Sequence, residues 1–486
     1  MLFNSYIFVF LFLPLCLVGY FGLNHIRQYT FAQLFLFCMS LWFYGYFNPS
    51  YLPIILVSIV FNYSATQFFR KISNSWLKKT ILAIALAFNI GILFYYKYTD
   101  FFLENINLFF HKNFALRNIL LPLGISFFTF QQLSFVIDAY RGETLSYNFL
   151  QYASFVVYFP QLIAGPIVTH DELVPQFQDV QKKHFQWDHF SRGLFIFALG
   201  MGKKVLLADT FGNAVNWGYS NISSLDSTNA FLVMVAYTLQ IYFDFSGYCD
   251  MAIGIGQMMN IDLPVNFDSP YKALTITEFW SRWHKTLTRF FTKYIYIPLG
   301  GNRRGKFRTY LNTFIVFSVS GLWHGASWTF IIWGVLHGIF MILTRHWKKL
   351  FERVPPVLSW CITFLFLNFT WVIFRAEGVT DTIRFFRALF SMEFGPILPD
   401  ILSPFHSVCL RFFTDLLPAS FSSFISIAIL TGYYVLSLIS VIFFRNSHQK
   451  MQSFSPNFRT AVITAILLIW CIFSFSGIST FLYFNF

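Results

Sequence analysis

The chain has 486 residues, of which 56% are hydrophobic, 11% are charged and 68 are phenylalanine. A soluble domain of this length has too little interior to bury so many apolar side chains, so the composition excludes a water-soluble globular protein. The net charge of +13 comes from basic residues grouped beside apolar runs, which is typical of membrane proteins and argues against nucleic-acid binding. We therefore expect an all-α, polytopic integral membrane protein.

Apolar runs long enough to cross a bilayer recur along the whole chain, and they predict about ten or eleven transmembrane helices. The runs are Ser5–Leu23, Phe31–Phe47, Tyr51–Phe68, Thr80–Tyr96, Ser191–Leu207, Ala230–Gly247, Leu311–Leu322, Trp328–Leu343, Val357–Phe374, Phe424–Phe444 and Ala461–Ser476. No Lys or Arg precedes the first run and no small-x-small motif follows it, so we expect a retained helix rather than a cleaved signal.

The placement of Lys and Arg predicts the orientation, because short loops rich in these residues stay in the cytoplasm. Five basic groups predict cytoplasmic loops: Arg70–Lys79, Lys182–Lys204, Lys285–Arg308, Arg345–Arg353 and Arg445–Arg459. The segment Glu377–Ser423 and both ends of the chain are predicted to lie outside.

Three regions interrupt the helical pattern with proline, glycine or glutamine: Leu121–Gly142, Val156–Ile167 and Asn260–Tyr271. Irregular backbone at membrane depth persists only where protein or water satisfies its polar groups. We expect broken or re-entrant elements that line a cavity. With no internal repeat or linker, residues 1–486 are expected to form one membrane domain, with a core motif region at 120–340.

Aromatic and basic residues alternate between Thr275 and Ile297. This pattern predicts a helix that lies in the membrane interface and projects His284. The alternative is an amphipathic helix that only caps the bundle.

His324 stands in an apolar sequence between Gly321 and Gly325. It lies 16 residues past Arg308, so a continuous helix would lift it about 24 Å from the cytoplasmic surface. An intramembrane histidine is a functional-site hypothesis by default, although its ring could instead bond a helix carbonyl and stabilise packing. His337 would lie about 20 Å from His324 if one helix carried both, too far to share a small substrate.

Asp244 and Asp250 are six residues apart and would point in different directions on a helix, so they do not predict an acid–base dyad. We expect Asp244 to orient another polar group, a histidine or a basic residue, and Asp250 to mark an interface. Ser246 lacks the Gly-x-Ser-x-Gly turn of a hydrolase. The six cysteines are scattered singly, so neither a disulfide framework nor a metal site is predicted.

Four blocks carry a resemblance: Tyr158–Ile167, Asp244–Gly254, Glu278–Arg303 and Gly321–Gly338. The last two contain the pairs Trp283-His284 and Trp323-His324. Together the blocks resemble the membrane-bound O-acyltransferase superfamily, and within it the alginate O-acetyltransferase-like branch.

The resemblance implies a ring of helices around a central acyl-transfer tunnel, with funnels from the two membrane faces meeting near the active histidine. It implies that His324 is the histidine essential for acyl transfer and that His284 is the second one. The residues expected to line the tunnel or bind substrate are Trp283, Trp323, Asp244, Tyr242, Asn302, Arg282 and Arg289. Arginines at the cytoplasmic mouth would meet a coenzyme A phosphate, or would be ordinary positive-inside charge.

The expected function is O-acetyl transfer from a cytoplasmic thioester donor, acetyl-coenzyme A or another acyl thioester, to an extracellular or cell-wall polysaccharide such as alginate, peptidoglycan or another glycan. The expected setting is the bacterial cytoplasmic (inner) membrane with its lipids, no bound cofactor or metal, and a separate exported acetyltransferase as partner. His324 would act as general base or as transient acyl carrier. The alternatives are a transporter or flippase, for which an inverted repeat is missing, and a lipid acyltransferase with a long-chain donor.

Overall fold

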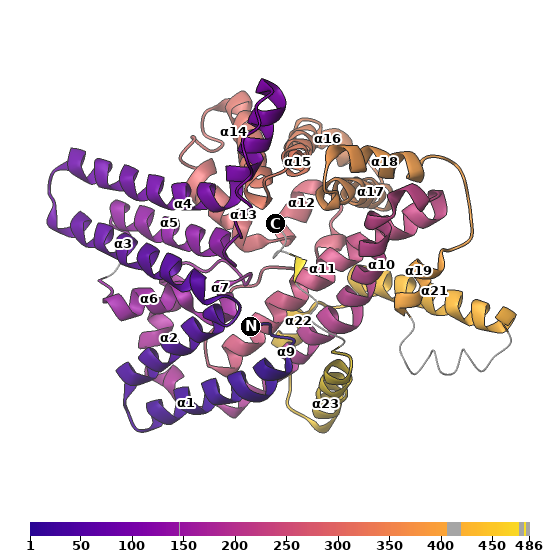
Figure 1. Ribbon diagram of the computed structural model, residues 1–486. Coiled ribbons are helices and arrows are strands. Elements are labelled where there is room, and N and C mark those ends of the chain that lie inside the picture. Colours follow the sequence, from indigo (N-terminus) through magenta and orange to yellow (C-terminus); the bar gives the residue numbers. More distant parts are fainter. Residues whose placement is uncertain (145, 406–418, 476–480, 483–486) are drawn as a thin grey trace.

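The computed structural model describes residues 1–144, 146–405, 419–475 and 481–482, and it consists of helices joined by short connections (Figure 1). In the first half these are η1 (Phe8–Phe12), α1 (Leu13–His25), α2 (Tyr29–Gly45), η2 (Pro49–Tyr51), α3 (Leu52–Lys71), α4 (Ser75–Phe110), α5 (Ile125–Arg141), α6 (Phe149–Val157), α7 (Phe159–Leu162), α8 (His170–Gln178), η3 (Gln181–Lys183), α9 (Trp187–Gly202), η4 (Lys203–Ala208), α10 (Asp209–Ser220) and η5 (Ile222–Ser224). In the second half they are α11 (Ser227–Met258), η6 (Pro270–Lys272), α12 (Ile276–Arg282), α13 (Lys285–Phe291), η7 (Thr292–Tyr296), α14 (Gly305–His324), α15 (Trp328–His346), α16 (Lys348–Phe351), α17 (Pro356–Arg375), α18 (Val379–Leu389), α19 (Pro399–Leu402), η8 (Ser403–Phe405), α21 (Ala419–Phe443), α22 (Ser447–Gln452) and α23 (Phe458–Phe473).

The all-helical membrane fold predicted from the sequence is confirmed, and each of the eleven apolar runs forms helix. Seven helical stretches in the described residues are both long and apolar enough to cross a bilayer. The runs at α2, α9, α14 and α23 are helical but do not reach that length and hydropathy. The total of ten or eleven spans stays a prediction.

Helix α11 forms the centre of the molecule. In its most apolar stretch 89% of the residues are buried, against 17% for α4 at the periphery. α9 packs closely along α11. A Cβ added at Gly200 would lie only 2.6 Å from the carbonyl oxygen of Gly247, so the two backbones approach where these glycines lie. Such close backbone approach between small residues is a common way for helices to associate in membranes.

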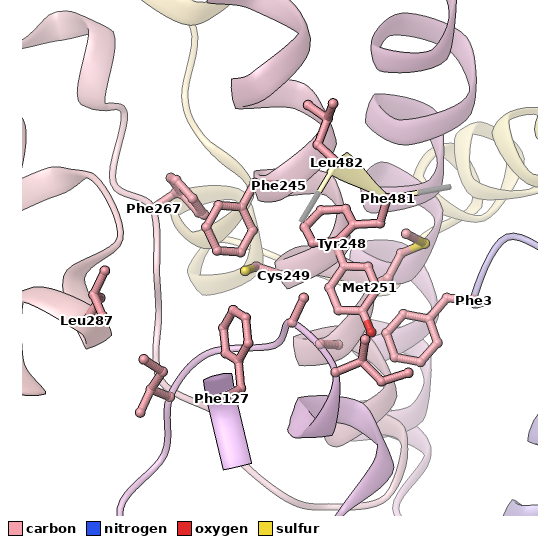
Figure 2. Packing of buried hydrophobic residues seen from close by; sticks show 14 of the residues in the cluster. Phe3, Phe127, Phe245, Tyr248, Cys249, Met251, Phe267, Leu287, Phe481 and Leu482 are labelled. Atoms are coloured by element: carbon pink, nitrogen blue, oxygen red, sulfur yellow. The ribbon is translucent and has the colours of Figure 1, made fainter. Parts of the chain in front are cut away.

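Both ends of the described chain reach α11 (Figure 2). The rings of Phe3 and Phe481 each lie 4.7 Å from the ring of Tyr248, and all three side chains are buried. Leu482 donates its backbone N–H to Asp244 at 3.0 Å. The predicted outside position of the final residue, Phe486, falls outside the described residues.

Two of the three interrupted regions are irregular as predicted: the chain breaks at Tyr158 between α6 and α7, and residues 163–169 and 261–269 are not helical. The prediction was wrong for most of Leu121–Gly142. After Gly124, which has a φ of 71°, α5 runs as one helix that buries Gln131 and Gln132. Gln132 is held there by side-chain hydrogen bonds to Asn62 and Ser58, so its polarity does not break the helix.

Candidate active site

The segment around His284 is not the continuous interfacial helix that the sequence suggested. α12 ends at Arg282 and α13 begins at Lys285, and His284 between them has a left-handed φ of 45°. Such a conformation is costly for a residue other than glycine and persists only where its surroundings fix it. The ring is fully buried, at 0% exposure, rather than projecting from the interface.

The irregular segment of residues 261–269 fixes this turn. Asp268 donates its N–H to the carbonyl of Arg282 at 2.9 Å, and Lys285 donates to the carbonyl of Asn266 at 3.0 Å. Asn266 Oδ1 accepts from the hydroxyl of Thr286 at 2.9 Å and lies 3.1 Å from His284 Nδ1. Because this oxygen is an acceptor, Nδ1 carries the proton and Nε2 is the basic nitrogen of His284.

Burial lowers the pKa of His284 to about 3. The two helices on either side of His284 have seven residues each and are too short to cross a bilayer. The ring is kept from water by the surrounding side chains of the protein rather than by lipid. His284 is therefore neutral at the pH of a living cell, the form that can accept a proton.

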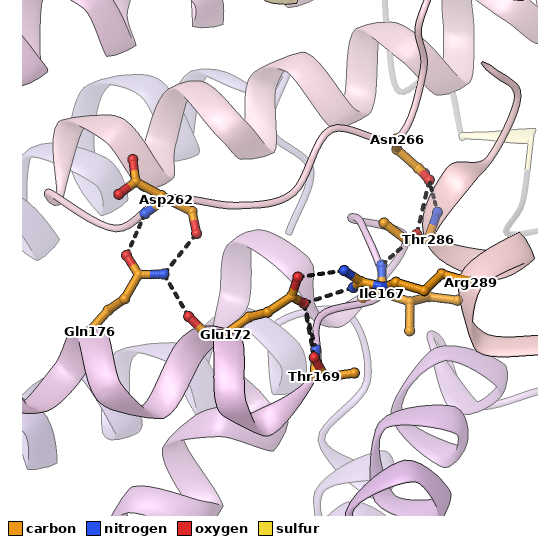
Figure 3. A network of polar contacts seen from close by, with 8 residues as sticks. All are labelled: Ile167, Thr169, Glu172, Gln176, Asp262, Asn266, Thr286 and Arg289. Atoms are coloured by element: carbon orange, nitrogen blue, oxygen red, sulfur yellow. Dashed lines mark hydrogen bonds and ion pairs between the residues drawn. The ribbon is translucent and has the colours of Figure 1, made fainter. Parts of the chain in front are cut away.

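A polar network joins Asn266 to the molecular surface (Figure 3). Thr286 Oγ1 accepts from the N–H of Ile167 at 3.0 Å, and Arg289 donates to the carbonyl of Ile167 at 3.2 Å. The Arg289 guanidinium also binds both carboxylate oxygens of Glu172, at 2.5 and 2.7 Å. Arg289 thus ties α13 to the 163–169 segment and supports the turn that carries His284.

Arg282, expected at a substrate mouth, has its guanidinium 2.9 Å from Glu278 and 3.2 Å from the carbonyl of Asp268. It therefore holds α12 in place. Asn302 lies exposed in the loop before α14 and lines none of the cavities described below. These placements give neither residue a contact with the two histidines.

His324 is the last residue of α14, which runs unbroken from Gly305, so the continuous helix assumed for the depth prediction is confirmed, and the depth in the membrane stays a prediction. α14 turns back into α15 through Gly325–Ser327. The two helices touch closely: a Cβ at Gly334 would lie 2.5 Å from the carbonyl oxygen of Phe317. This hairpin fixes the height and rotation of His324.

Aromatic rings surround His324 on three sides. The ring centroids of Trp323, Trp333 and Phe374 lie 4.8, 5.1 and 5.1 Å from that of His324, each at a steep angle. The indole of Trp323 also lies 6.3 Å from the ring of His284. Trp323 therefore brings together two histidines that are 40 positions apart in the chain.

Lys97 of α4 caps the end of α14, a role that the sequence analysis missed. Its Nζ donates to the backbone carbonyls of Trp323 at 2.7 Å and His324 at 2.9 Å. The next residue, Tyr98, donates its hydroxyl to the carbonyl of Leu322 at 2.5 Å. These carbonyls have no partner within the helix, and an ammonium group at a helix C-terminus is electrostatically favourable.

His337 has a structural role. Its Nδ1 accepts from the indole N–H of Trp280 at 3.2 Å, and Nε2 lies 3.1 Å from Thr370 Oγ1. The Thr370 hydroxyl donates to a backbone carbonyl, so Nε2–H of His337 must be the donor to Thr370. The single continuous helix from His324 to His337 does not form, because α14 and α15 are separate and antiparallel neighbours.

Asp244 orients a lysine, which is one of the two partners expected for it. Lys204 Nζ lies 2.6 Å from Asp244 and 2.8 Å from Asp209, and the adjacent Lys203 pairs with Asp250 at 2.6 Å. Both lysines lie in η4, a π-helical stretch inside the helix that continues from α9 into α10. They belong to the apolar run Ser191–Leu207, which was predicted to be helical, and not to a loop, as the basic group Lys182–Lys204 had also suggested.

Trp283 and Tyr242 belong to an aromatic layer behind His284. Trp283 is buried between Phe267, at a ring distance of 4.9 Å, and Trp371, at 5.2 Å. Tyr242 packs on Tyr271 at 5.4 Å, and the ammonium of Lys203 lies 5.7 Å from its ring. Their contacts are those of packing residues that hold the α12–α13 turn against α11.

Two cavities reach the end of α14. The larger, about 740 Å³, is lined by the turn Gly325–Ser327 and by polar residues that include Lys204, Asp209, Gln240, Arg375 and Glu377. Glu377 begins the segment predicted to face outside. A small cavity of about 30 Å³ is lined by His324 and Trp323, and Lys97 borders both cavities.

Comparison with known proteins identifies the family. Residues 64–380 match the model of MBOAT, the membrane-bound O-acyltransferase family. The chain is 43% identical to the peptidoglycan O-acetyltransferase of Helicobacter pylori over 81% of this chain and 80% of that protein. It is 40% identical to the probable alginate O-acetylase AlgI of Pseudomonas aeruginosa, over 80% and 75% respectively. It is 28% identical to the teichoic acid D-alanyltransferase of Bacillus subtilis, over 54% and 70%. The chain therefore belongs to the membrane-bound O-acyltransferase family and is a membrane O-acetyltransferase.

Proposed function

We propose that this protein transfers an acetyl group from acetyl-coenzyme A, bound from the cytoplasm, to a hydroxyl of an extracytoplasmic glycan, with His324 as the central catalytic residue. The observation that supports this most is the meeting of two buried histidines at Trp323, close to a polar cavity of about 740 Å³ that is lined by Gly325, which follows His324, and by Phe374, which packs on the His324 ring. A donor from the cytoplasm and an acceptor from outside can react only where both reach the same catalytic group, at the inner end of a cavity.

The chemistry requires one proton transfer and one exchange of bonds. The glycan hydroxyl oxygen attacks the thioester carbonyl, and the basic nitrogen of His324 takes the hydroxyl proton. The C–S bond then breaks, and the coenzyme A thiolate receives the proton. His284, neutral and with Nε2 as its basic nitrogen, is the alternative acceptor of that same proton.

A second route uses the same residues. The nitrogen of His324 attacks the thioester, the C–S bond breaks, and coenzyme A leaves as its thiol with the proton of the imidazole ring. The acyl-imidazole then passes the acetyl group to the glycan hydroxyl, whose proton returns to the ring. Acyl-enzyme that accumulates on His324 when donor is supplied without acceptor supports this route, whereas direct transfer leaves no labelled protein.

The acceptor side is proposed from the cavity and from the relatives. Asp209, Gln240, Arg375 and Glu377 offer hydrogen-bond donors and acceptors suited to sugar hydroxyls. The relatives are named for peptidoglycan and for alginate, so either glycan is a reasonable first acceptor. We further propose a bacterial cytoplasmic (inner) membrane location and an exported acetyltransferase that completes the transfer at the outer mouth.

A transporter or a lipid acyltransferase would predict other outcomes. A transporter moves an acetylated molecule without breaking a thioester, and a lipid acyltransferase prefers a long-chain donor. Purified protein in liposomes that turns over acetyl-coenzyme A repeatedly only in the presence of acceptor, and does not use palmitoyl-coenzyme A, fits the proposal alone.

The decisive genetic experiment is acetyl analysis of cell-wall and capsular polymers in a deletion strain that carries either wild-type protein or His324→Ala. We expect wild type to restore the acetyl esters and His324→Ala to restore none, at equal abundance in the membrane. His337→Gln is the matched control, because it replaces a histidine bound by Trp280 and Thr370. Normal acetylation by His324→Ala would contradict the proposal.

A further inference from the structure

A second large cavity lies away from the histidines, between α9, η4, α11, α21, α22 and α23, and is here called the lateral groove. It has a volume of about 610 Å³. Its walls are mostly apolar and include Leu206 of η4, Leu436 of α21 and Trp470 of α23. Leu436 and Trp470 are 68% and 57% exposed, so the groove opens sideways, where the bilayer lies. Figure 1 shows α21 and α23 at the periphery of the molecule.

One end of the groove is basic. Lys203, Arg445 and Lys450 line it together with Ser269 and Ser447. Lys203 is neutralised by Asp250 at 2.6 Å, whereas Arg445 and Lys450 form no ion pair with any described carboxylate. The groove therefore ends in two exposed cations and two hydroxyl groups, an arrangement that favours a phosphate.

The dimensions fit an acyl chain. On α21 and its end the groove is lined from Ile429 to Phe444, which is about 22 Å along the helix axis. One leaflet contributes about half of the roughly 30 Å hydrocarbon core, so a chain of that leaflet can lie along this wall. The basic end belongs to the Arg445–Arg459 group, which the positive-inside rule places at the cytoplasmic surface.

We propose that the lateral groove binds an anionic phospholipid of the cytoplasmic leaflet, with an acyl chain along α21 and its phosphate at Arg445 and Lys450. Apolar walls that open into the bilayer select a lipid, and the two uncompensated cations select a negatively charged headgroup. This binding site is separate from the acyl-transfer chemistry and does not depend on the role of His324.

The groove also borders the support of the active site. A smaller cavity next to it shares Lys203, Tyr242, Asn446 and Ser447 with the groove and reaches Asn266, the partner of His284. Asn446 is held by Asp268 at 2.8 Å and Ser269 at 3.0 Å. A lipid phosphate at this end would therefore brace the irregular segment 261–269.

The test measures retained lipid by native mass spectrometry after reconstitution of the full-length protein in nanodiscs of equal phosphatidylglycerol and phosphatidylcholine. Wild type is expected to retain phosphatidylglycerol preferentially. Arg445→Gln with Lys450→Gln should weaken that preference about 30-fold, because each basic residue near a membrane surface contributes roughly a further fivefold.

A second variant fills the groove without touching its charges. Gly432 lines the groove, and a Cβ added there meets no atom within 4 Å, so Gly432→Phe projects a ring into the open space. We expect this variant to fold normally and to lose the retained phosphatidylglycerol. Gly91→Phe, at an equally open glycine of α4, is the control and should retain it.

Equal retention of the two lipids by wild type would overturn the proposal, as would wild-type retention of phosphatidylglycerol by Gly432→Phe. A second copy of the chain or a partner helix in the groove would appear as added protein mass in place of lipid, and this too would overturn it.

Discussion

Replacement of Lys97 by Met tests how the end of α14 that carries His324 is held. The two hydrogen bonds from Lys97 Nζ to the carbonyls of Trp323 and His324, at 2.7 and 2.9 Å, disappear in this variant. An ammonium–carbonyl bond contributes about 1.5 kcal/mol at the lower end, so the end of α14 loses about 3 kcal/mol. If these two hydrogen bonds position His324 in the transition state, their loss lowers kcat/KM by about 150-fold.

The assay is acetyl transfer from radiolabelled acetyl-coenzyme A by purified protein in liposomes. We expect the loss to appear in kcat, with KM for the donor within about twofold, because Lys97 acts through the helix end. Tyr98→Phe removes one neutral hydrogen bond to Leu322 and should cost about fivefold. Lys79→Met, at the exposed start of α4, is the matched control and should leave kcat and KM unchanged. Wild-type kcat for Lys97→Met at normal abundance would refute the positioning argument.

Three further predictions follow from the fold. Gly334→Ala should lower the Tm in detergent and the activity together, since its Cβ would meet the Phe317 carbonyl at 2.5 Å, whereas Gly91→Ala should change neither; equal Tm values would show that the α14–α15 contact is not tight. A variant with all six cysteines replaced by Ser or Ala should keep its acetyl transfer, because Cys16, Cys249 and Cys471 are buried and Cys38 and Cys361 lie on the apolar helices α2 and α17, settings that disfavour a reactive thiolate. Loss of activity on replacing one cysteine in a normally inserted protein would mean that the acetyl group travels through sulfur. In that cysteine-free background, an impermeant maleimide added outside should label a cysteine at Glu377 but not at Arg303 or Lys349; labelling at Arg303 would reverse the orientation and contradict the cytoplasmic donor.

The helical fold and the place of His324 at the end of one continuous helix could be predicted because both depend on local sequence. Apolar runs determine where helices form in a membrane, and a fixed rise per residue gives the distance of His324 from the start of α14. The separation of His324 and His337 could not be predicted in the same way. Gly325–Ser327 ends one helix and starts the next. The separate apolar runs Leu311–Leu322 and Trp328–Leu343 indicate this break, but the distance between the two histidine rings depends on how the two helices then pack.

Long-range partners account for what the sequence analysis missed. Lys97 directly follows an apolar run, and in the sequence it resembles an ordinary lysine at the membrane interface. Its role becomes visible only once the fold brings the end of α14 to α4. The available sequence signal was a charge inside a helix that continues to Phe110. Arg289 looked like a phosphate ligand because Glu172 is 117 positions away. His284 was expected to project from an interfacial helix because the segment that buries it, residues 261–269, is irregular and carries no helical periodicity.

The central claim is that His324 passes acetyl groups between the two sides of a membrane. The most direct measurement uses sealed proteoliposomes of one orientation, with labelled acetyl-coenzyme A supplied only at the cytoplasmic face and peptidoglycan or alginate fragments enclosed on the other side. We expect labelled O-acetyl esters on the enclosed glycan with wild-type protein and none with His324→Ala. Esters formed equally by the variant, or formed only when donor and glycan share one side, would contradict the account.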